Sequence, residues 1–272
     1  MRDEDCVAFL QWALPRMEMR WRGLRRVRKQ VCKRLGRRLR ELELDDLDAY
    51  RLHLAAGPDE WTVLEYLCRI TISRFYRDRA VFDTLRDPVL PNLGRRSLAR
   101  GDSVLRCWSA GCASGEEPYS IRLAWDLDAS RQVPGIELEI VATDVDAHML
   151  ERAQTACYPE GSLRELPSEW MVAAFEPRGR DLCLRPRFRS GVELLQADIR
   201  SEMPGGTYDL ILCRNLVFTY FDEPLQVRIL ERMLDRLRTG GFLILGAHES
   251  LPEGSWPLDR PHGSLPILRR IE

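Results

Sequence analysis

From residue 103 onward, short apolar runs alternate with longer amphipathic stretches. Residues 222–237 carry apolar side chains at helical spacing and predict a long amphipathic helix. Apolar runs predict five strands, over residues 103–108, 136–142, 192–196, 208–212 and 242–246. This alternation predicts an α/β fold with a mainly parallel sheet and helices on both of its faces.

The first 70 residues show helical spacing instead. Over residues 16–40, apolar side chains recur every three or four positions and arginine or lysine fills most others, which predicts one basic helix. Asp45 and Asp46 open a second expected helix that ends at Gly57, and residues 61–68 predict a third. We therefore expect a small helical N-terminal domain over residues 1–70.

Two further segments complete the predicted organisation. Residues 71–98 form a bridging helix that contributes to the site, and Pro88, Pro91 and Gly94 are expected to break it. An α/β domain then extends over residues 99–272. Apolar and basic residues alternate over 183–189, which predicts a small antiparallel β-ribbon inserted at about residues 160–190.

Composition narrows the class of protein. The formal net charge is −1, so the chain as a whole is not a polycation. The eight cysteines include no CxxC pair, which predicts reduced thiols rather than disulfides or a zinc site. No apolar run approaches the roughly 20 residues of a membrane span, and the N-terminus lacks the apolar core of a signal peptide. We expect a cytoplasmic protein without a metal, and its oligomeric state stays open.

A glycine loop at residues 109–115 joins the first predicted strand to a helix. It lacks the lysine of a phosphate-binding P-loop and is not the dinucleotide fingerprint. Gly111 and Gly115 leave room for an uncharged part of a ligand, so adenosine with an amino-acid tail, S-adenosylmethionine (SAM), is the first candidate. Ser114 and Glu117 have capping-box spacing, and Pro118 suits the first helical turn. A plain glycine turn explains this loop equally well when it is taken alone.

Polar side chains follow the predicted strands where each one ends. Asp144 follows the second strand and could accept both ribose hydroxyls, and Asp198 follows the third and could accept from an adenine amino group. Asn215 follows the fourth, and Glu116 or Glu117 lies at the glycine loop. Because the carboxyl ends of parallel strands meet at one edge, these groups predict a shared acidic site. Acidic groups suit the cationic SAM rather than ATP or NADP, although each carboxylate alone could be a helix cap.

Four motifs occur in an order that resembles the chemotaxis receptor glutamate O-methyltransferases (CheR-type SAM-dependent methyltransferases). They are residues 71–77 (TISRFYR), 114–120 (SGEEPYS), 143–146 (TDVD), and 213–215 (CRN) with 220–222 (YFD). The resemblance implies a Rossmann-like SAM-dependent methyltransferase domain behind a small all-α domain. It also implies methyl transfer from SAM to glutamates of chemoreceptor helices, with S-adenosylhomocysteine (SAH) as product.

The resemblance also implies roles for matching residues. Together with the loop and strand-end pattern, it places ten residues at the cofactor: Thr71, Ser73, Arg77, Gly111, Glu116, Asp144, Asp198, Ile199, Arg214 and Asn215. Catalytic roles fall to Arg77 and Tyr220. Thr71 and Ser73 replace the family's asparagine and threonine, and one extra residue separates Asn215 from Tyr220.

The chemistry fits a carboxylate acceptor. A glutamate is already ionised at neutral pH and needs alignment rather than a general base. Arg77 could orient it through its fork of donors, and Tyr220 could add one hydrogen bond. Alternatively, Arg77 forms an ion pair between the domains and Tyr220 is a core tyrosine.

The acceptor stays open at this point. The basic helix could dock an acidic protein helix or simply be a solvated face, and nucleic acid is disfavoured because only Trp21 interleaves with the arginines. Protein glutamate methylation is the leading hypothesis. The alternatives are a small-molecule or other protein acceptor in a biosynthetic pathway, and a SAM-binding regulatory module without catalysis.

Overall fold

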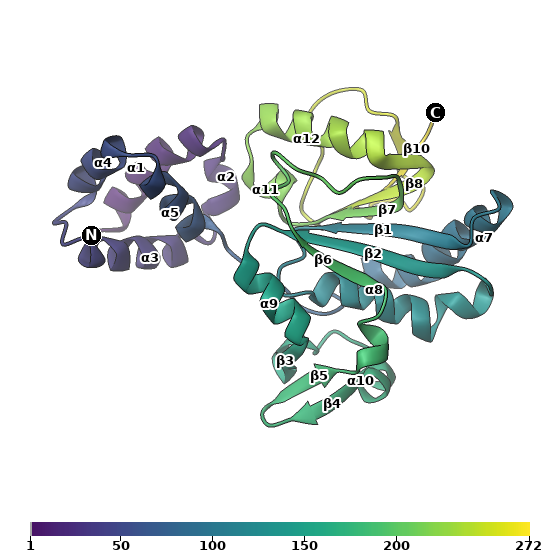
Figure 1. Ribbon diagram of the computed structural model, residues 1–272. Helices are drawn as coiled ribbons and strands as arrows, with labels where there is room; N and C mark the ends of the chain where they lie inside the picture. Colours follow the sequence, from purple (N-terminus) through teal and green to yellow (C-terminus); the bar gives the residue numbers. More distant parts are fainter. Residues whose placement is uncertain (1) are drawn as a thin grey trace. The chain divides into compact units, whose positions relative to one another are not determined.

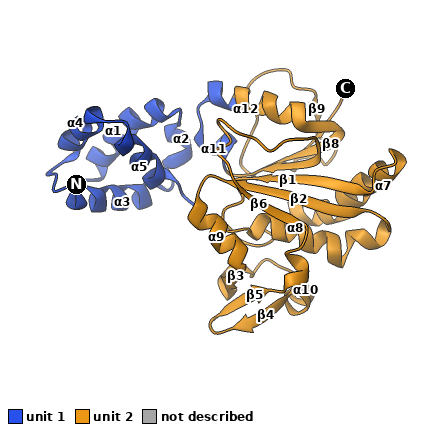
Figure 2. Ribbon diagram, viewed as in Figure 1, with its two compact units in different colours: residues 1–72, 216–226 blue, residues 73–215, 227–272 orange. Residues whose placement is uncertain are grey.

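The computed structural model describes residues 2–272 and divides into two compact units (Figures 1 and 2). The helical unit comprises the chain up to residue 72 together with residues 216–226. The α/β unit comprises residues 73–215 and 227–272. The chain therefore leaves the α/β unit after Asn215, adds a short segment to the helical unit, and returns. No helix among residues 2–272 has the length and apolarity required to cross a membrane.

The helical unit is built from short helices around buried apolar side chains. Its helices are α1 (Asp3–Ala13), a 3₁₀ turn (Leu14–Met17), α2 (Trp21–Leu24), α3 (Arg28–Glu41), α4 (Leu47–Ala56), α5 (Asp59–Cys68) and α11 (Val217–Tyr220). The second and third predicted helices are confirmed as α4 and α5. The side chain of Asp46 accepts from the N–H of Ala49 and so caps α4.

The prediction of one helix over residues 16–40 is wrong, because the segment is divided between α2 and α3. A tertiary contact explains the division. The N–H of Arg20 donates to the carbonyl of Tyr220 at 2.8 Å, so it is unavailable to a continuous helix. A Cβ on Gly23 would collide with the carbonyl of Thr219, which shows how closely α2 and α11 approach. The apolar spacing is correct, and α3 buries Val31, Leu35 and Leu39.

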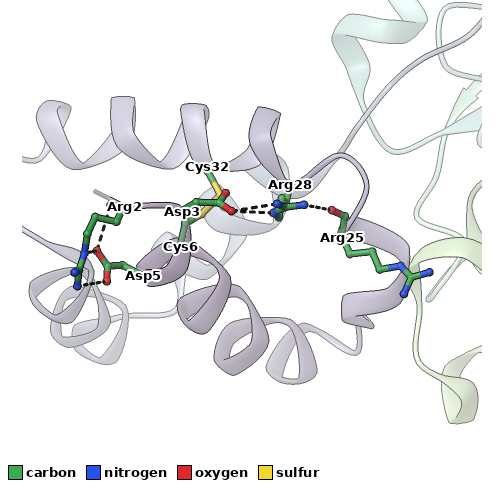
Figure 3. Close-up of a disulfide and its surroundings, with 7 residues drawn as sticks. All are labelled: Arg2, Asp3, Asp5, Cys6, Arg25, Arg28 and Cys32. Atoms are coloured by element: carbon green, nitrogen blue, oxygen red, sulfur yellow. Dashed lines mark hydrogen bonds and ion pairs between the residues drawn. A yellow bond between two sulfur atoms is a disulfide. The ribbon is translucent and has the colours of Figure 1, made fainter.

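Two disulfides correct the expectation of reduced thiols. Cys6 of α1 bonds to Cys32 of α3, beside an ion pair in which Arg28 Nη2 lies 3.1 Å from Asp3 Oδ2 (Figure 3). Cys157 bonds to Cys183 in the α/β unit. Each pair is 26 residues apart, so spacing gave no sign of a bond that depends on which elements pack together.

Thiol titration checks this pairing directly. The unfolded, unreduced protein should react with four equivalents of a thiol reagent, because four cysteines are free: Cys68, Cys107, Cys112 and Cys213. After reduction the count should rise to all eight cysteines. Eight reactive thiols before reduction would contradict both disulfides.

The α/β unit contains a seven-stranded sheet in the order β6-β2-β1-β7-β8-β10-β9. The strands are β1 (Val104–Ala110), β2 (Glu137–Asp144), β6 (Val192–Gln196), β7 (Tyr208–Cys213), β8 (Leu237–Leu245), β9 (Leu258–Asp259) and β10 (Ile267–Arg270). The first five in spatial order pair in parallel, and β10 and β9 are antiparallel. The mainly parallel sheet and all five predicted strands are confirmed.

Helices cover both faces of this sheet. Helix α12 (Glu223–Arg236) lies on one side of the sheet and α8 (Glu116–Leu127) on the other, while α7 (Leu90–Ala99) and α9 (Ala147–Thr155) lie toward opposite ends of the sheet (Figure 1). The chain builds outward from β1 to β2 and β6, then crosses to β7 and β8 on the other side of β1. Such a reversal of strand order opens a crevice at the carboxyl ends of the strands.

The expected break at Pro91 and Gly94 is wrong, since both residues lie inside α7, which follows α6 (Arg79–Thr84) and a π segment (Leu85–Val89). Pro91 occupies the first turn, where a helix loses nothing by the missing N–H. Gly94 allows close packing, because a Cβ there would lie 2.9 Å from Val133 Cγ2. Pro88 lies within the π segment, beside the non-helical backbone of Asp87.

The predicted insertion is confirmed as a three-stranded antiparallel sheet in the order β3-β5-β4. Its strands are β3 (Cys157–Pro159), β4 (Phe175–Arg178) and β5 (Asp181–Leu184), with α10 (Ser168–Ala174) before β4. The alternation over 183–189 is strand only as far as Leu184, because Pro186–Phe188 is a 3₁₀ turn. The disulfide of Cys157 joins β3 to β5.

Candidate functional site

The glycine loop between β1 and α8 folds over the end of β2. The N–H groups of Gly111 and Cys112 both donate to the carbonyl of Thr143, at 2.8 and 2.9 Å. Gly111 and Gly115 have φ values of 74° and 91°, which glycine adopts without strain. Gly115 also serves packing, since a Cβ there would lie 2.8 Å from a ring carbon of Tyr119.

The predicted capping box is wrong. Gly115 is the N-cap of α8, and no side chain of residues 2–272 caps this helix. Ser114 Oγ instead donates toward the carboxylate of Glu116, 3.0 Å from each oxygen. Glu117 turns away from the helix end toward Ser109 and Arg214. Pro118 does lie in the first turn of the helix, as predicted.

Glu116 presents a buried carboxylate at the glycine loop, with 2% of its surface exposed. Among residues 2–272, the hydroxyl of Ser114 is the only side-chain donor that reaches it. Tyr158 of β3 holds that serine by donating to its carbonyl at 2.7 Å. Burial, together with the nearby Glu116 carboxylate, raises the pKa of Tyr158, so its hydroxyl remains a donor. A buried carboxylate with one donor is well suited to a cationic ligand group.

Asp144 ends β2 and ties it to the glycine loop. Its Oδ2 accepts from the N–H of Ala113 at 2.8 Å, and its Oδ1 accepts from the N–H of Asp146 at 2.9 Å. Two backbone donors therefore fix the orientation of this carboxylate. Asp146 has a different task, because it caps α9 by accepting from the N–H groups of His148 and Met149.

Asp198 and Ile199 follow β6 at the same edge. The N–H of Ala197 donates to the carbonyl of Asp144 at 3.0 Å, so the ends of β6 and β2 are joined. The guanidinium of Arg200 binds the Asp198 carboxylate, with Nη2 2.6 Å from Oδ2. An adenine amino group would share these oxygens with Arg200. Ile199 is 7% exposed and contributes apolar surface.

Ser73 and Arg77 belong to a segment that is anchored between them. The N–H of Phe75 donates to the carbonyl of Ser162, and the N–H of Tyr76 donates to Ser120 Oγ, both at 2.9 Å. Ser73 itself is half-buried. Arg77 follows these anchors, and its Nη2 lies 3.4 Å from Asn215 Oδ1. The structure thus brings Arg77 to the end of β7.

Arg214 is almost fully buried, with 6% exposure. Its guanidinium donates to Glu117 at 3.1 Å, to Asp78 at 2.5 Å and to the carbonyl of Arg77 at 2.9 Å. Its Nε is buried without a hydrogen-bond partner in the part of the chain that the structure describes. Burial raises the pKa of Glu117, while Arg214 and Ser109 oppose that rise. These bonds hold the Arg77 segment against α8 and β7.

Asn215 and Glu249 form a cluster at the ends of β7 and β8. Glu249 Oε2 accepts from the N–H groups of Asn215 and Gly246, at 2.8 and 2.7 Å. The sequence interpretation missed Glu249, although it follows the fifth predicted strand and the strand-end rule could have found it. It also missed Asp78, which had no signal because no strand precedes it.

Thr71 and Tyr220 belong to the helical unit, whereas the nine other predicted cofactor residues belong to the α/β unit. Tyr220 ends α11, and its carbonyl accepts from the N–H of Arg20. Thr71 is exposed just after α5. Their roles at the cofactor and in catalysis stay predictions from the sequence resemblance.

Comparisons with known proteins match this chain to one family of methyltransferases. Residues 71–258 match the family described as CheR methyltransferase, SAM binding domain. Chemotaxis protein methyltransferase 2 of Pseudomonas aeruginosa is 33% identical over 231 residues, which cover 83% of this chain and 79% of that protein. A probable chemotaxis protein methyltransferase of Rhizobium etli is 32% identical over 226 residues, covering 80% and 83%.

A longer relative shares the same region. An uncharacterized 104.1 kDa protein of Rhodobacter capsulatus is 32% identical over 221 residues, which cover 81% of this chain. The match covers only 23% of that protein, so this chain spans less than a quarter of its length.

Proposed function

Since the chain belongs to the CheR methyltransferase family and carries its SAM-binding domain, we propose that it transfers a methyl group from SAM to a glutamate carboxylate of a protein. The acceptor that we propose is an acidic helix, such as a chemoreceptor cytoplasmic segment. The relatives of similar length are named chemotaxis protein methyltransferases, which supports this choice of acceptor.

One observation carries the proposal: the glycine loop joins two carboxylates at the carboxyl edge of the parallel sheet. Glu116 is buried with one hydroxyl donor, and Asp144 is oriented by the N–H of Ala113 from the same loop. This acidic donor set fits SAM, which is cationic and carries ribose hydroxyls. Glu116 would hold a cationic group of SAM, and Asp144 would accept the ribose hydroxyls.

The residues of this chain then need only to bind and orient the acceptor glutamate. SAM supplies an electrophilic methyl group on its sulfonium. The acceptor glutamate is ionised at neutral pH, so no residue needs to remove a proton. Arg77 can bind that carboxylate through two parallel N–H groups and orient it, and Asn215 keeps the Arg77 guanidinium at the end of β7.

Radiolabelled SAM tests the function. Purified protein incubated with a chemoreceptor cytoplasmic fragment should transfer label to it, and mild base should release the label as methanol. Base-stable label would place the methyl group on nitrogen, carbon or an ether oxygen and overturn carboxylate methylation. Tight SAH binding without transfer to any acceptor would indicate a regulatory module instead.

One face of α3 supports an acidic partner. Lys29, Lys33, Arg37 and Arg40 are exposed at spacings of four, four and three residues, so they share one side of the helix, the α3 basic face. Among the described residues, Lys29, Lys33 and Arg40 have no ion-pair partner, and Arg37 has only Glu41 at 3.6 Å. Arg38 is different, because it binds the buried Glu60 and lowers its pKa.

Reversing charge on the α3 basic face should weaken acceptor binding. The variant K29E/K33E places two negative charges where the acidic acceptor helix would bind, and these charges would repel it. The KM for the acceptor should therefore rise about tenfold or more, equivalent to about 1.4 kcal/mol. SAH affinity measured by calorimetry should not change. The effect should shrink at high salt because exposed charges are screened.

The matched control is R131E/R260E, which changes the same charge at two exposed arginines of the α/β unit. Its acceptor KM should stay near the wild-type value. An equal rise in both double variants would contradict docking on α3 and indicate an effect of net charge.

A further inference from the structure

We propose that Glu249 is a positioning residue that fixes Asn215 for SAM binding, an inference that rests on the proposed function. Glu249 lies outside the four sequence motifs. Its contacts join the carboxyl ends of β7 and β8, on the β7 side of the crevice.

A single carboxylate oxygen makes the connection. Glu249 Oε2 accepts from the N–H of Asn215, the second residue after β7, at 2.8 Å. The same atom accepts from the N–H of Gly246, the first residue after β8, at 2.7 Å. The N–H of Glu249 donates to the carbonyl of Gly246 at 3.0 Å, which closes the turn that brings the side chain back. Both strand ends therefore share one acceptor.

Asn215 needs such support because its backbone is left-handed, with φ of 56°. Residues other than glycine adopt this conformation at a cost, and asparagine is among those that tolerate it best. The hydrogen bond from its N–H to Glu249 is formed in this conformation. The conformation in turn directs the Asn215 amide oxygen toward Arg77.

Gly246 shows how tightly the cluster is packed. A Cβ on Gly246 would lie 2.8 Å from Asn215 Oδ1 and 2.8 Å from Glu249 Oε2. The amide of Asn215 and the carboxylate of Glu249 therefore crowd the same α-carbon. Any change that moves Glu249 releases Asn215, and this would alter the crevice edge without touching Asp144 or Glu116.

The chemistry favours a long side chain with a strong acceptor. Glutamine keeps the length and one carbonyl oxygen, which can still accept two hydrogen bonds, though more weakly than a carboxylate. Alanine removes the acceptor and leaves both N–H groups unsatisfied. The series wild type, E249Q and E249A therefore separates loss of charge from loss of the acceptor.

Calorimetry with SAH tests the role without any acceptor protein. We expect E249A to weaken SAH binding about tenfold and E249Q to stay within about threefold of wild type. In methyl transfer, E249A should raise the KM for SAM, and E249Q should leave that KM within about threefold of wild type. The control D259A removes another carboxylate of the α/β unit, the partner of Arg269, and should bind SAH normally.

G246A gives an independent check, because it disturbs the cluster while leaving the chemistry of Asn215 and Glu249 intact. It should weaken SAH binding about tenfold, as expected for E249A. G246A therefore still tests the cluster when E249A does not fold. Unaltered SAH affinity in folded E249A, or in G246A, would overturn the role of Glu249. Wild-type protein that fails to bind SAH would instead overturn the proposed function, and with it this inference.

Discussion

Replacing Arg214 with methionine should lower the free energy of unfolding by about 3–5 kcal/mol, the usual cost of removing one partner of a buried ion pair. Among the described residues the guanidinium has three acceptors, and the side chain of Glu117 is more buried than that of Asp78. Without Arg214, the Glu117 carboxylate would remain in a desolvated place, with Ser109 as its only side-chain donor among the described residues. Asp78 is partly exposed and can be hydrated instead.

The decrease in the free energy of unfolding caused by R214M should depend on pH. The direction of this dependence follows from the pKa of Glu117. Burial already raises that pKa, and removing Arg214 removes a group that lowers it. A carboxyl group whose pKa is raised by folding binds its proton more tightly in the folded state, so protonation stabilises the fold. The difference in the free energy of unfolding between wild type and R214M should therefore become smaller as the pH falls and larger as the pH rises.

Urea unfolding at several pH values measures both effects. The double variant R214M/E117Q should recover much of the lost stability, because a neutral pair leaves no buried charge. R269M is the matched control. It removes an arginine from the partly exposed pair with Asp259 and should cost about 1 kcal/mol or less. A loss in R214M that is equal at every pH and unrelieved by E117Q would contradict the role of Glu117.

The α/β architecture and the strand-end residues were predictable because they follow from local pattern and topology. The apolar runs correctly predicted β1, β2, β6, β7 and β8, and parallel strands bring their carboxyl ends to one edge. This rule places Asp144 at that edge, where it ends β2. Glu249 obeys the same rule after β8, so the sequence contained a signal for it.

Other features depend on contacts between distant residues, which no local pattern contains. The break between α2 and α3 follows from Arg20 and Gly23 meeting the segment at Thr219 and Tyr220. The disulfide of Cys6 with Cys32 depends on how α1 packs against α3.

The roles of charged residues were the least predictable part. Arg214 resembles a cofactor residue in sequence, yet its guanidinium binds Glu117, Asp78 and the Arg77 carbonyl. Glu117 has capping-box spacing from Ser114, yet it is the ion-pair partner of Arg214. Spacing indicates which residues lie near one another, whereas the partner of each charge is decided by burial in three dimensions.

Replacing Asp144 should have the largest effect on cofactor binding. D144A removes the acceptor for the N–H groups of Ala113 and Asp146, which releases the glycine loop, and it also removes the proposed ribose acceptor. Hydrogen bonds to charged groups contribute about 1.5–3 kcal/mol each. The loss of two to ribose therefore predicts SAH binding weakened at least about 100-fold, as measured by calorimetry.

D144N should be nearly as damaging, although it keeps the shape of the side chain. Each oxygen of Asp144 accepts from a different backbone N–H, so one of the two would face the donor NH₂ group of asparagine. The matched control is D146A, two residues away, which removes the cap of α9. It should cost about 1 kcal/mol of stability and leave SAH affinity within about threefold of wild type. D144A that binds SAH as tightly as D146A would show that the carboxylate after β2 does not hold the cofactor.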